Sequence, residues 1–356
     1  MKSLIFGYGI TGQSFERYLN KKGIDFEIYD EEITGPNITN TLPNKEKLQS
    51  LEMVYLSPGI NLKKIYPKGE FDQISYLTDL DIFFQDDSSY KIGVTGTNGK
   101  STYCYHLHQI LDESQLIGNI GKPVLDSINS CAYSIIELSS FQLEKVHEIQ
   151  LDFGVLLNIA PDHIDHHGTL AEYTRVKNRI KESKRSIEES DPKKLWSIIM
   201  GMNNRVVRDI QFTDLPHRLE SMNGSKWLKH LINDSKATNL AALEYALNKM
   251  DDSYFLILCG DPNKEQYKNY KIIGPEKIFI FGSYAAEIYK RISHPNKILL
   301  HNQDLLSVMN KIRSDKSFPY IQTILFSPGH PSGNDYKNFE QRGDHFKQLV
   351  REICVD

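Results

Sequence analysis

The stretch GVTGTNGKST at residues 93–102 constrains the fold most strongly. The apolar run YKIGVT before it predicts a strand, and TYCYHLHQILDE after it predicts a helix. Such a turn presents backbone N–H groups, a helix N-terminus, an ammonium and a hydroxyl to one anion. Val94 stands where the standard phosphate loop has its first glycine, but two later glycines still permit the turn. We therefore predict a phosphate-binding loop formed by Gly96, Thr97, Asn98, Gly99, Lys100, Ser101 and Thr102.

A second glycine-rich turn opens the chain. Gly7, Gly9 and Gly12 follow the strand-like SLIF at Gly-x-Gly-x-x-Gly spacing, and the next strand-like run ends at Asp30. This order is typical of a Rossmann-like unit, in which the glycines approach a diphosphate and the carboxylate binds a ribose. A ligand-free tight turn is the alternative. A dehydrogenase that binds NAD is another, although it leaves the loop at 96–102 unexplained.

Strand-like and helix-like segments alternate along the rest of the chain, which predicts an α/β protein with parallel sheets. A length of 356 residues is sufficient for two or three cored domains. We expect three: a Rossmann-like domain (residues 1–88), a central P-loop ATPase-like domain (89–214) and a Rossmann-like C-terminal domain (215–356).

Composition excludes several classes of partner. The net charge of -4 gives no general attraction to nucleic acid or to an anionic membrane. The four cysteines form no Cys-x-x-Cys pair, and no apolar run approaches the ~20 residues of a membrane-spanning helix. The apolar start at MKSLIF is too short for a signal peptide. We expect a cytoplasmic monomer that binds small molecules, without a nucleic-acid or membrane partner.

Further motifs resemble the Mur ligases, and in particular the branch that adds D-glutamate to UDP-N-acetylmuramoyl-L-alanine. They occur in the family's order: ELSSFQLE (137–144), LNIAPDHIDHHGTL (157–170), LPHRLE (215–220), NDSKATN (233–239) and SPGHPSGNDYKNFEQRGDHF (327–346). The resemblance implies that ATP phosphorylates the carboxylate of the UDP-sugar-linked alanine. The amine of D-glutamate then attacks the acyl phosphate. It also implies ATP and two Mg²⁺ ions as cofactors.

The same resemblance assigns the catalytic residues. Lys100 would neutralise the terminal phosphates, Ser101 and Glu137 would hold the first Mg²⁺, and His163 would hold the second. Lys177 matches a lysine that the family carbamylates; the alternative is a solvent-facing lysine on a helix. Glu137 could also be an incidental carboxylate at a strand end. The run His163, Asp165, His166 and His167 could suggest a zinc hydrolase, although this spacing matches no common ligand pattern.

The remaining assignments concern the ligands. For ATP the resemblance implies Arg218, Asp234 and Asn204. For the UDP-sugar it implies Ile10, Thr11, Asp30, Ser57, Pro58, Gly59, Asn119 and Gln142. For D-glutamate it implies Lys236, Thr238, Lys264, Ser332 and Phe339. The alternatives are exposed charges for Arg218 and Asp234, a polar turn for Asn119, and a core position for Phe339, which lies at near-helical spacing from Phe346.

One segment departs from the family pattern. Only 37 residues separate Lys177 from Leu215, where family members carry more strands and a Gly-x-His-Asn motif for adenine. GMNNR is the remaining match, and its second asparagine is Asn204. Three alternatives therefore stay open: another Mur-type ligase, a folylpolyglutamate-type ligase, and a non-catalytic descendant that binds the UDP-sugar.

Overall fold

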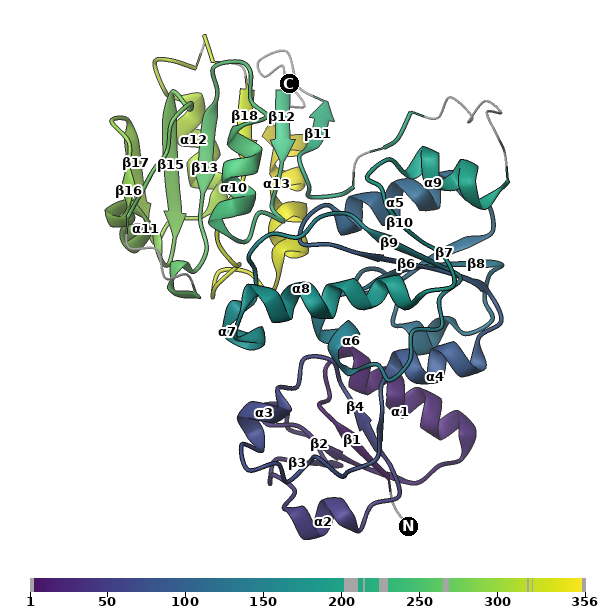
Figure 1. The fold of residues 1–356 in the computed structure, drawn as a ribbon. Coiled ribbons are helices and arrows are strands. Elements are labelled where there is room, and N and C mark those ends of the chain that lie inside the picture. Colours follow the sequence, from purple (N-terminus) through teal and green to yellow (C-terminus); the bar gives the residue numbers. More distant parts are fainter. Residues whose placement is uncertain are drawn as a thin grey trace. The chain divides into compact units, whose positions relative to one another are not determined.

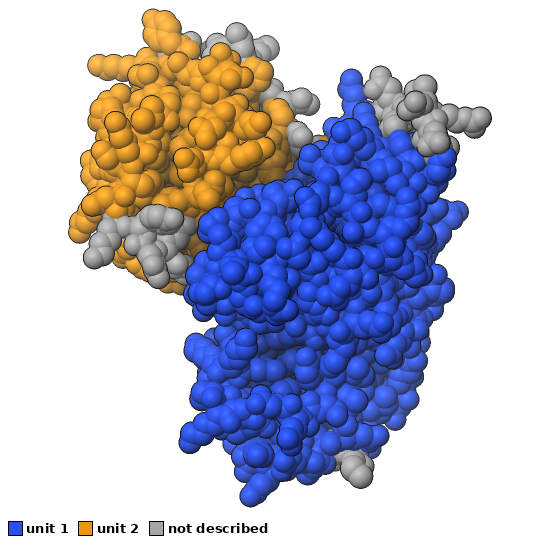
Figure 2. All heavy atoms as spheres, in the orientation of Figure 1, with its two compact units in different colours: residues 1–212 blue, residues 213–356 orange. Residues whose placement is uncertain are grey.

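The computed structural model describes residues 3–201, 211–213, 215–223, 230–264, 269–318, 320–321 and 323–353. The chain divides into two compact units, residues 1–212 (unit 1) and 213–356 (unit 2), which Figure 2 colours separately. Parallel sheets with helical crossovers form both units, so the predicted α/β class is confirmed. No helix within the described ranges has both the length and the apolar character needed to cross a membrane.

The first sheet of unit 1 is parallel and has the strand order β3-β2-β1-β4-β5. Its strands are β1 (Ser3–Phe6), β2 (Phe26–Tyr29), β3 (Ile38–Thr39), β4 (Val54–Leu56) and β5 (Tyr76–Leu77). The helices between and after them are α1 (Ile10–Lys22), α2 (Lys45–Gln49), α3 (Leu62–Ile65) and α4 (Asp79–Asp86). The turn from β1 into α1 carries the first glycine motif, as expected for a Rossmann-like opening.

The second sheet of unit 1 is also parallel, in the order β10-β9-β6-β8-β7. Its strands are β6 (Tyr90–Thr95), β7 (Ser114–Gly118), β8 (Tyr133–Glu137), β9 (Phe153–Leu156) and β10 (Ser186–Glu188). The chain leaves the central β6 toward β7 and β8 on one side and later adds β9 on the other. The carboxyl end of β6 is therefore a topological switch point, where open α/β sheets bind ligands.

The helices of this second part are α5 (Lys100–Ile110), α6 (Ser140–Lys145), α7 (Ile164–His167), α8 (Leu170–Asn178) and α9 (Pro192–Ile199), with the 3-10 turns η1 (Val124–Ser127) and η2 (Arg179–Glu182). Figure 1 shows α5 beside α9, and α8 along the sheet near α6. Successive strand residues point to opposite faces. Accordingly Ile135 joins the cluster that contains α5 and α9, whereas Ile136 joins the cluster that contains α6 and α8.

One hydrophobic cluster joins the two sheets of unit 1. It contains Ile5 and Phe15 from the first sheet and its helix, Phe83 from α4, and Leu143 and Val176 from α6 and α8. Because these side chains are buried together, the two sheets form one compact unit. The division of the chain into three domains stays a prediction.

Unit 2 contains a six-stranded sheet in the order β11-β12-β18-β13-β15-β17, in which only β11 is antiparallel to its neighbour. The strands are β11 (Glu220–Asn223), β12 (His230–Asn233), β13 (Phe255–Leu258), β15 (Lys277–Gly282), β17 (Lys297–His301) and β18 (Thr323–Phe326). A small pair is formed by β14 (Tyr270–Lys271) and β16 (Ile292–Ser293). The helices are α10 (Leu240–Leu247), α11 (Ala285–Arg291), α12 (Leu305–Arg313) and α13 (Phe339–Ile353), and η3 (Pro262–Lys264) is a 3-10 turn.

Candidate active site

The predicted phosphate loop lies at the switch point of the second sheet, between β6 and α5. The segment after β9 holds its backbone: the Thr97 N–H donates to the Asn158 carbonyl, and the Asn98 N–H donates to Asn158 Oδ1, both at 2.9 Å. Gly99 has φ +83, which favours glycine. A Cβ on Gly96 would come within 3.0 Å of the Leu157 Cβ. Both glycines are therefore required by this backbone and this packing.

Two ammonium groups converge on one carbonyl of this loop. Lys100 Nζ donates to the Gly96 oxygen at 2.9 Å and to the Thr97 oxygen at 3.0 Å. Lys177 Nζ, from α8, donates to the same Gly96 oxygen at 2.8 Å and to Thr95 Oγ1 at 3.2 Å. Lys177 is 1% exposed, so a solvent-facing lysine is ruled out. Burial first, and the charge of Lys100 second, lower the pKa of Lys177 to about 7.

Glu137 ends β8 beside the phosphate loop, because β8 pairs with β6 in register Val94 to Glu137. The residue is 2% exposed, and its Oε1 accepts from Asn119 Nδ2 at 2.8 Å. Within the described ranges its buried Oε2 has no hydrogen-bond partner. A buried carboxylate oxygen without a partner is costly, and a hard divalent cation would satisfy it. With the buried Ser101 in the first turn of α5, Glu137 fits a Mg²⁺ site better than an incidental strand end.

His163 lies in the segment that follows β9, the strand that pairs with β6 on the side opposite to β8. It adopts φ 50 at the start of α7, its side chain is 46% exposed, and its ring meets the edge of Phe141 at 4.9 Å. An exposed imidazole on a fixed backbone can take an incoming metal ion. Its Nε2 lies 3.6 Å from Asp162 Oδ2, which could orient it.

The other two histidines of this run lie in a separate cluster. Ligand atoms of Glu144, His166 and His167 lie within 4.8 Å of one another. Asn61 Oδ1 accepts from the Lys64 N–H, so its amide Nδ2 faces His166 Nδ1 at 3.2 Å. Nδ1 therefore accepts, and the proton lies on His166 Nε2, which donates to Glu144 at 2.6 Å. Both ring nitrogens of His166 already take part in hydrogen bonds, so this pattern favours a hydrogen-bonded cluster over a zinc centre.

The first sheet brings together the residues predicted for the UDP-sugar. The Tyr8 N–H donates to Asp30 Oδ2 at 2.6 Å, and Ser57 Oγ donates to the Gly7 carbonyl at 2.7 Å. Asp30 Oδ1 also accepts from the Ile33 N–H at 2.8 Å. The glycine turn and the loop after β4 are thus bound to each other. Around them lie the 74% exposed Ile10, the partly buried Thr11 and Pro58, and the exposed Gly59.

Two further residues predicted for the UDP-sugar already have partners. Asn119, after β7, holds Glu137 rather than forming a simple polar turn. Gln142 is the third residue of α6 and forms a capping box, in which its Oε1 accepts from the N–H and Oγ of Ser139. Gln142 is also buried, at 6% exposed.

In unit 2, Asp234 is the centre of the predicted nucleotide contacts. It is 7% exposed, so it is not a surface charge. Its Oδ2 accepts from Ser327 Oγ at 2.6 Å, and its Oδ1 accepts from the Leu219 N–H at 3.1 Å. Burial raises its pKa to about 6. Leu219 and His217, on either side of the half-buried Arg218, have φ 45 and φ 64. Such left-handed residues cost about 1–3 kcal/mol and are concentrated at functional sites.

The residues predicted for D-glutamate form one contact pair and three separate positions. Lys236 Nζ lies 3.8 Å from the centre of the Phe339 ring. Phe339 begins α13 and is partly buried, whereas Phe346 on the same helix is fully buried in the core. Ser332 is buried and Thr238 is half-buried. The backbone of Lys264 ends η3, but its side chain and the whole of Asn204 lie outside the described residues.

Sequence reasoning missed the residue that braces the phosphate loop. Asn158 contacts the loop through its backbone, its Oδ1 and its Nδ2. Its position directly after an apolar strand was the available signal. Arg342 was also missed: it is fully buried in unit 2 and donates to the carbonyls of Ser235 and His330.

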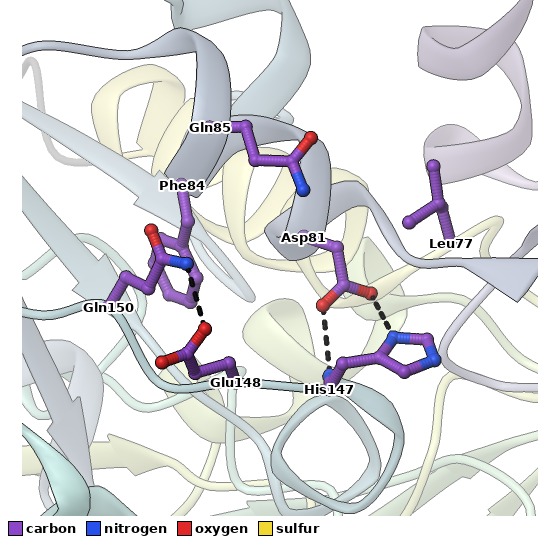
Figure 3. Close-up of a pocket in the computed structure, with 7 residues that line it drawn as sticks. All are labelled: Leu77, Asp81, Phe84, Gln85, His147, Glu148 and Gln150. Carbon is purple, nitrogen blue, oxygen red and sulfur yellow. Dashed lines mark hydrogen bonds and ion pairs between the residues drawn. The ribbon is translucent and has the colours of Figure 1, made fainter.

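A separate pocket of about 190 Å³ lies away from these residues (Figure 3). It is lined by Leu77, Asp81, Phe84, Gln85, His147, Glu148 and Gln150. Four of its polar residues form two pairs: Asp81 accepts from the N–H of His147 and contacts its Nδ1 at 3.0 Å, and Gln150 donates to Glu148. It contains none of the predicted site residues, so the phosphate loop remains the candidate active site.

Comparison with known proteins agrees with this geometry. Residues 94–240 match the Mur ligase middle domain. The chain is 29% identical to the UDP-N-acetylmuramoylalanine--D-glutamate ligase of Buchnera aphidicola subsp. Acyrthosiphon pisum (strain Tuc7), with 99% of this chain and 98% of the relative covered. The corresponding ligase of Chlamydia abortus is 27% identical, over 98% and 97%. Residues 94–240 are thus similar to a Mur ligase middle domain, and the whole chain is similar to Mur ligases.

A solved Mur ligase shows the same fold. The crystal structure of MurF ligase from Thermotoga maritima in complex with ADP has a TM-score of 0.56, and it covers 99% of this chain and 95% of its own. At 13% identity this likeness concerns the fold alone. The Buchnera alignment is 439 residues long, against 356 in this chain. That relative therefore contains residues that this chain lacks, in agreement with a shortened chain.

Proposed function

We propose that this chain is an ATP-dependent amide ligase that adds D-glutamate to UDP-N-acetylmuramoyl-L-alanine in peptidoglycan precursor synthesis. The observation that carries the proposal is the group at the end of β6 and β8. Two lysines donate to the Gly96 carbonyl, beside a buried carboxylate oxygen that has no hydrogen-bond partner among the residues that the structure describes. The names of relatives that match nearly the whole chain support the choice of substrates.

In the proposed reaction the phosphate loop receives the triphosphate of ATP. Backbone N–H groups at the start of α5 and the ammonium of Lys100 would hold the β- and γ-phosphates. To do so, Lys100 exchanges its two carbonyl acceptors for phosphate oxygens. Ser101 and Glu137 would hold one Mg²⁺ and His163 a second. Bound there, these ions would neutralise the charge that develops between triphosphate and carboxylate.

Lys177 has a separate role in this proposal. A pKa of about 7 leaves much of its amine neutral near neutral pH, and a neutral amine can react with CO₂ to form a carbamate. The N–C bond forms and one proton leaves to solvent. The carbamate would place an anion beside Lys100 in place of the Lys177 ammonium. This change would remove the repulsion between the two lysines and would support a nearby metal ion.

The acceptor side completes the proposal. Asp30, Ser57 and the glycine turn would bind the UDP portion, and Lys236 with Phe339 would position D-glutamate. The carboxylate of the alanyl group attacks the γ-phosphorus, ADP leaves, and the D-glutamate amine then displaces phosphate from the acyl phosphate. Because both proposed nucleotides belong to the cytoplasmic pool, we place the reaction in the cytoplasm and take a monomer as the acting unit.

The test is phosphate release by the purified full chain with ATP, Mg²⁺ and UDP-N-acetylmuramoyl-L-alanine, with and without D-glutamate. We expect sustained release only when all are present, with the amide product found by mass spectrometry. The variant Lys100→Ala should abolish it. Full release by Lys100→Ala, or release that ignores D-glutamate, would overturn the proposal. Release with another amino acid alone would favour a different Mur-type ligase.

A further inference from the structure

Helix α6 lies between the two ends of the proposed reaction path. It begins three residues after Glu137, and Ser139 caps its N-terminus. Its last two residues, Glu144 and Lys145, reach back to residues 57–61 of the first sheet, here called the substrate loop. The substrate loop is therefore connected to the carboxyl end of β8 by one short helix.

The first contact is made by Lys145. Its Nζ donates to the Pro58 carbonyl at 2.5 Å, although the residue is only 7% exposed. Its ammonium also lies 6.0 Å from the centre of the Phe141 ring. Burial lowers its pKa to about 8. A buried ammonium is costly unless it is hydrogen-bonded, so the Pro58 carbonyl is held where Lys145 can reach it.

The second contact is made by Glu144 through His166. Glu144 Oε2 accepts from His166 Nε2 at 2.6 Å, and His166 Nδ1 accepts from Asn61 Nδ2 at 3.2 Å. Asn61 also caps α3, which fixes the direction of its amide. This chain of bonds fixes the far end of the substrate loop. At the near end, Ser57 Oγ is bound to the Gly7 carbonyl in the glycine turn.

We propose that Lys145 and the Glu144–His166 pair are positioning residues that hold the substrate loop in its ligand-binding conformation. This inference rests on the proposed function, because it takes residues 57–59 as contacts of the UDP-sugar. Without both contacts Gly59, which is exposed and has no atom near its Cβ position, would be free to move. Ordering the loop at the moment of binding would then reduce affinity for the UDP-sugar, whereas nucleotide at the phosphate loop would be unaffected.

The test uses the full chain and two ligands. Calorimetry gives the Kd of UDP-N-acetylmuramoyl-L-alanine and the Kd of Mg-ADP for wild type, Lys145→Met and His166→Gln. We expect the Kd of the UDP-sugar to rise about tenfold in each variant, because a preorganising contact is lost. The Kd of Mg-ADP should stay unchanged. Amide hydrogen exchange at residues 59–61 should accelerate in both variants. His166→Gln keeps Lys145 buried, so it serves if Lys145→Met folds poorly.

Lys63→Met is the matched control. Its side chain is 85% exposed and lies 3.9 Å from Glu144, so the change removes a neighbouring positive charge without touching either contact. Both Kd values should stay at wild type. If wild type fails to bind the UDP-sugar, the proposed function itself is wrong. If wild type binds and the variants bind equally well, or if they weaken both ligands alike, the positioning role is overturned.

Discussion

Lys100 and Lys177 donate to the same atom, the carbonyl oxygen of Gly96, from the helices α5 and α8. Two ammonium groups on one oxygen repel each other, and one of them is almost fully buried. Lys177 accordingly has its pKa lowered from 10.5 to about 7, with burial as the larger cause. The site therefore keeps a destabilised cation at the position where the proposed chemistry needs a carbamate.

The first prediction is that Lys177→Met separates stability from activity. The folded-state pKa lies below the unfolded value, so the unfolded state binds more protons between pH 7 and 10.5. The free energy of unfolding should therefore rise with pH across this window in wild type, and less in the variant. At pH 7 the variant should gain about 1–2 kcal/mol, because a buried charge is replaced by an apolar side chain. Ligation should be lost.

Chemical denaturation at several pH values, with assays of phosphate release, checks this outcome. Lys181→Met is the control. Lys181 lies four residues after Lys177 and is the exposed ion-pair partner of Glu188. It should change neither the pH slope nor activity. Lower stability of Lys177→Met at pH 7 would contradict the account of Lys177 as a destabilised cation.

The second prediction concerns Glu137→Gln. The change keeps the shape of the side chain but removes the anionic oxygen that has no hydrogen-bond partner in the described structure. We expect kcat to fall about 100-fold, since charge stabilisation by a metal ion is lost. The melting temperature should be maintained or should rise, because a buried unpaired carboxylate is costly. Titration of nucleotide binding with Mg²⁺ should lose its Mg²⁺ dependence.

Glu188→Gln is the control for this change, because Glu188 is an exposed carboxylate on the edge strand β10. It should leave kcat and the Mg²⁺ titration as in wild type. A Glu137→Gln enzyme with wild-type kcat would remove Glu137 from the metal site.

Lys177 and Glu137 also show how much of the candidate site could be predicted from the sequence. The loop spacing and the flanking strand and helix predicted the position of Lys100, because local backbone geometry determines it. The topology of the sheet places Glu137 beside the loop, and a strand-end carboxylate could be found from the apolar run before it. By contrast, the burial of Lys177 and its contact with Gly96 depend on how α8 packs on the sheet. Spacing alone did not distinguish it from a surface lysine.

The contacts between elements were the least accessible to sequence. Asn158, Lys145 and the Asn61–His166–Glu144 chain each join segments far apart in sequence. Such pairs have no local signal, since each residue type is common on loops and helix ends. In unit 2, only Leu240–Leu247 of the helix-like segment KATNLAALEYALNKM form the helix α10. Asn239 caps the N-terminus of α10, so the helix begins at Leu240.

The third prediction concerns the pH dependence of unit 2 through Asp234. Burial raises its pKa from 3.8 to about 6, so the folded state binds more protons than the unfolded state between these values. Its contribution to stability is present below pH 3.8 and is lost as pH rises through 6. Asp234→Asn should therefore be more stable than wild type above pH 6, by up to about 3 kcal/mol. Nucleotide affinity should fall.

Thermal unfolding between pH 4 and 8 checks the sign. Asp304→Asn is the control, since donation from Ser307 to this exposed helix cap lowers the pKa of Asp304. The pKa of this carboxyl lies below 3.8 in the folded state, so the variant should leave the pH slope between pH 4 and 8 close to that of wild type. Equal slopes for wild type and Asp234→Asn would show that burial of Asp234 does not cost what the structure implies.

The fourth prediction concerns recognition of D-glutamate. The ammonium of Lys236 lies 3.8 Å from the centre of the Phe339 ring, a distance at which the ring face attracts and orients a cation. Phe339→Leu keeps an apolar side chain at the start of α13 but removes that attraction. We expect KM for D-glutamate to rise about fivefold, corresponding to about 1 kcal/mol, while KM for ATP and kcat at saturating D-glutamate stay unchanged.

Tyr245→Leu provides the matched control, because Lys249 lies 5.4 Å from the centre of the 60% exposed Tyr245 ring on α10. Tyr245→Leu also removes a pair of an ammonium and an aromatic ring, but the resemblance does not assign this pair to D-glutamate. KM for D-glutamate, KM for ATP and kcat should therefore stay at their wild-type values. If Phe339→Leu instead lowers the melting temperature and raises every KM together, Phe339 acts as a packing residue at the start of α13. D-glutamate would then have to be held by Lys236 without help from the ring.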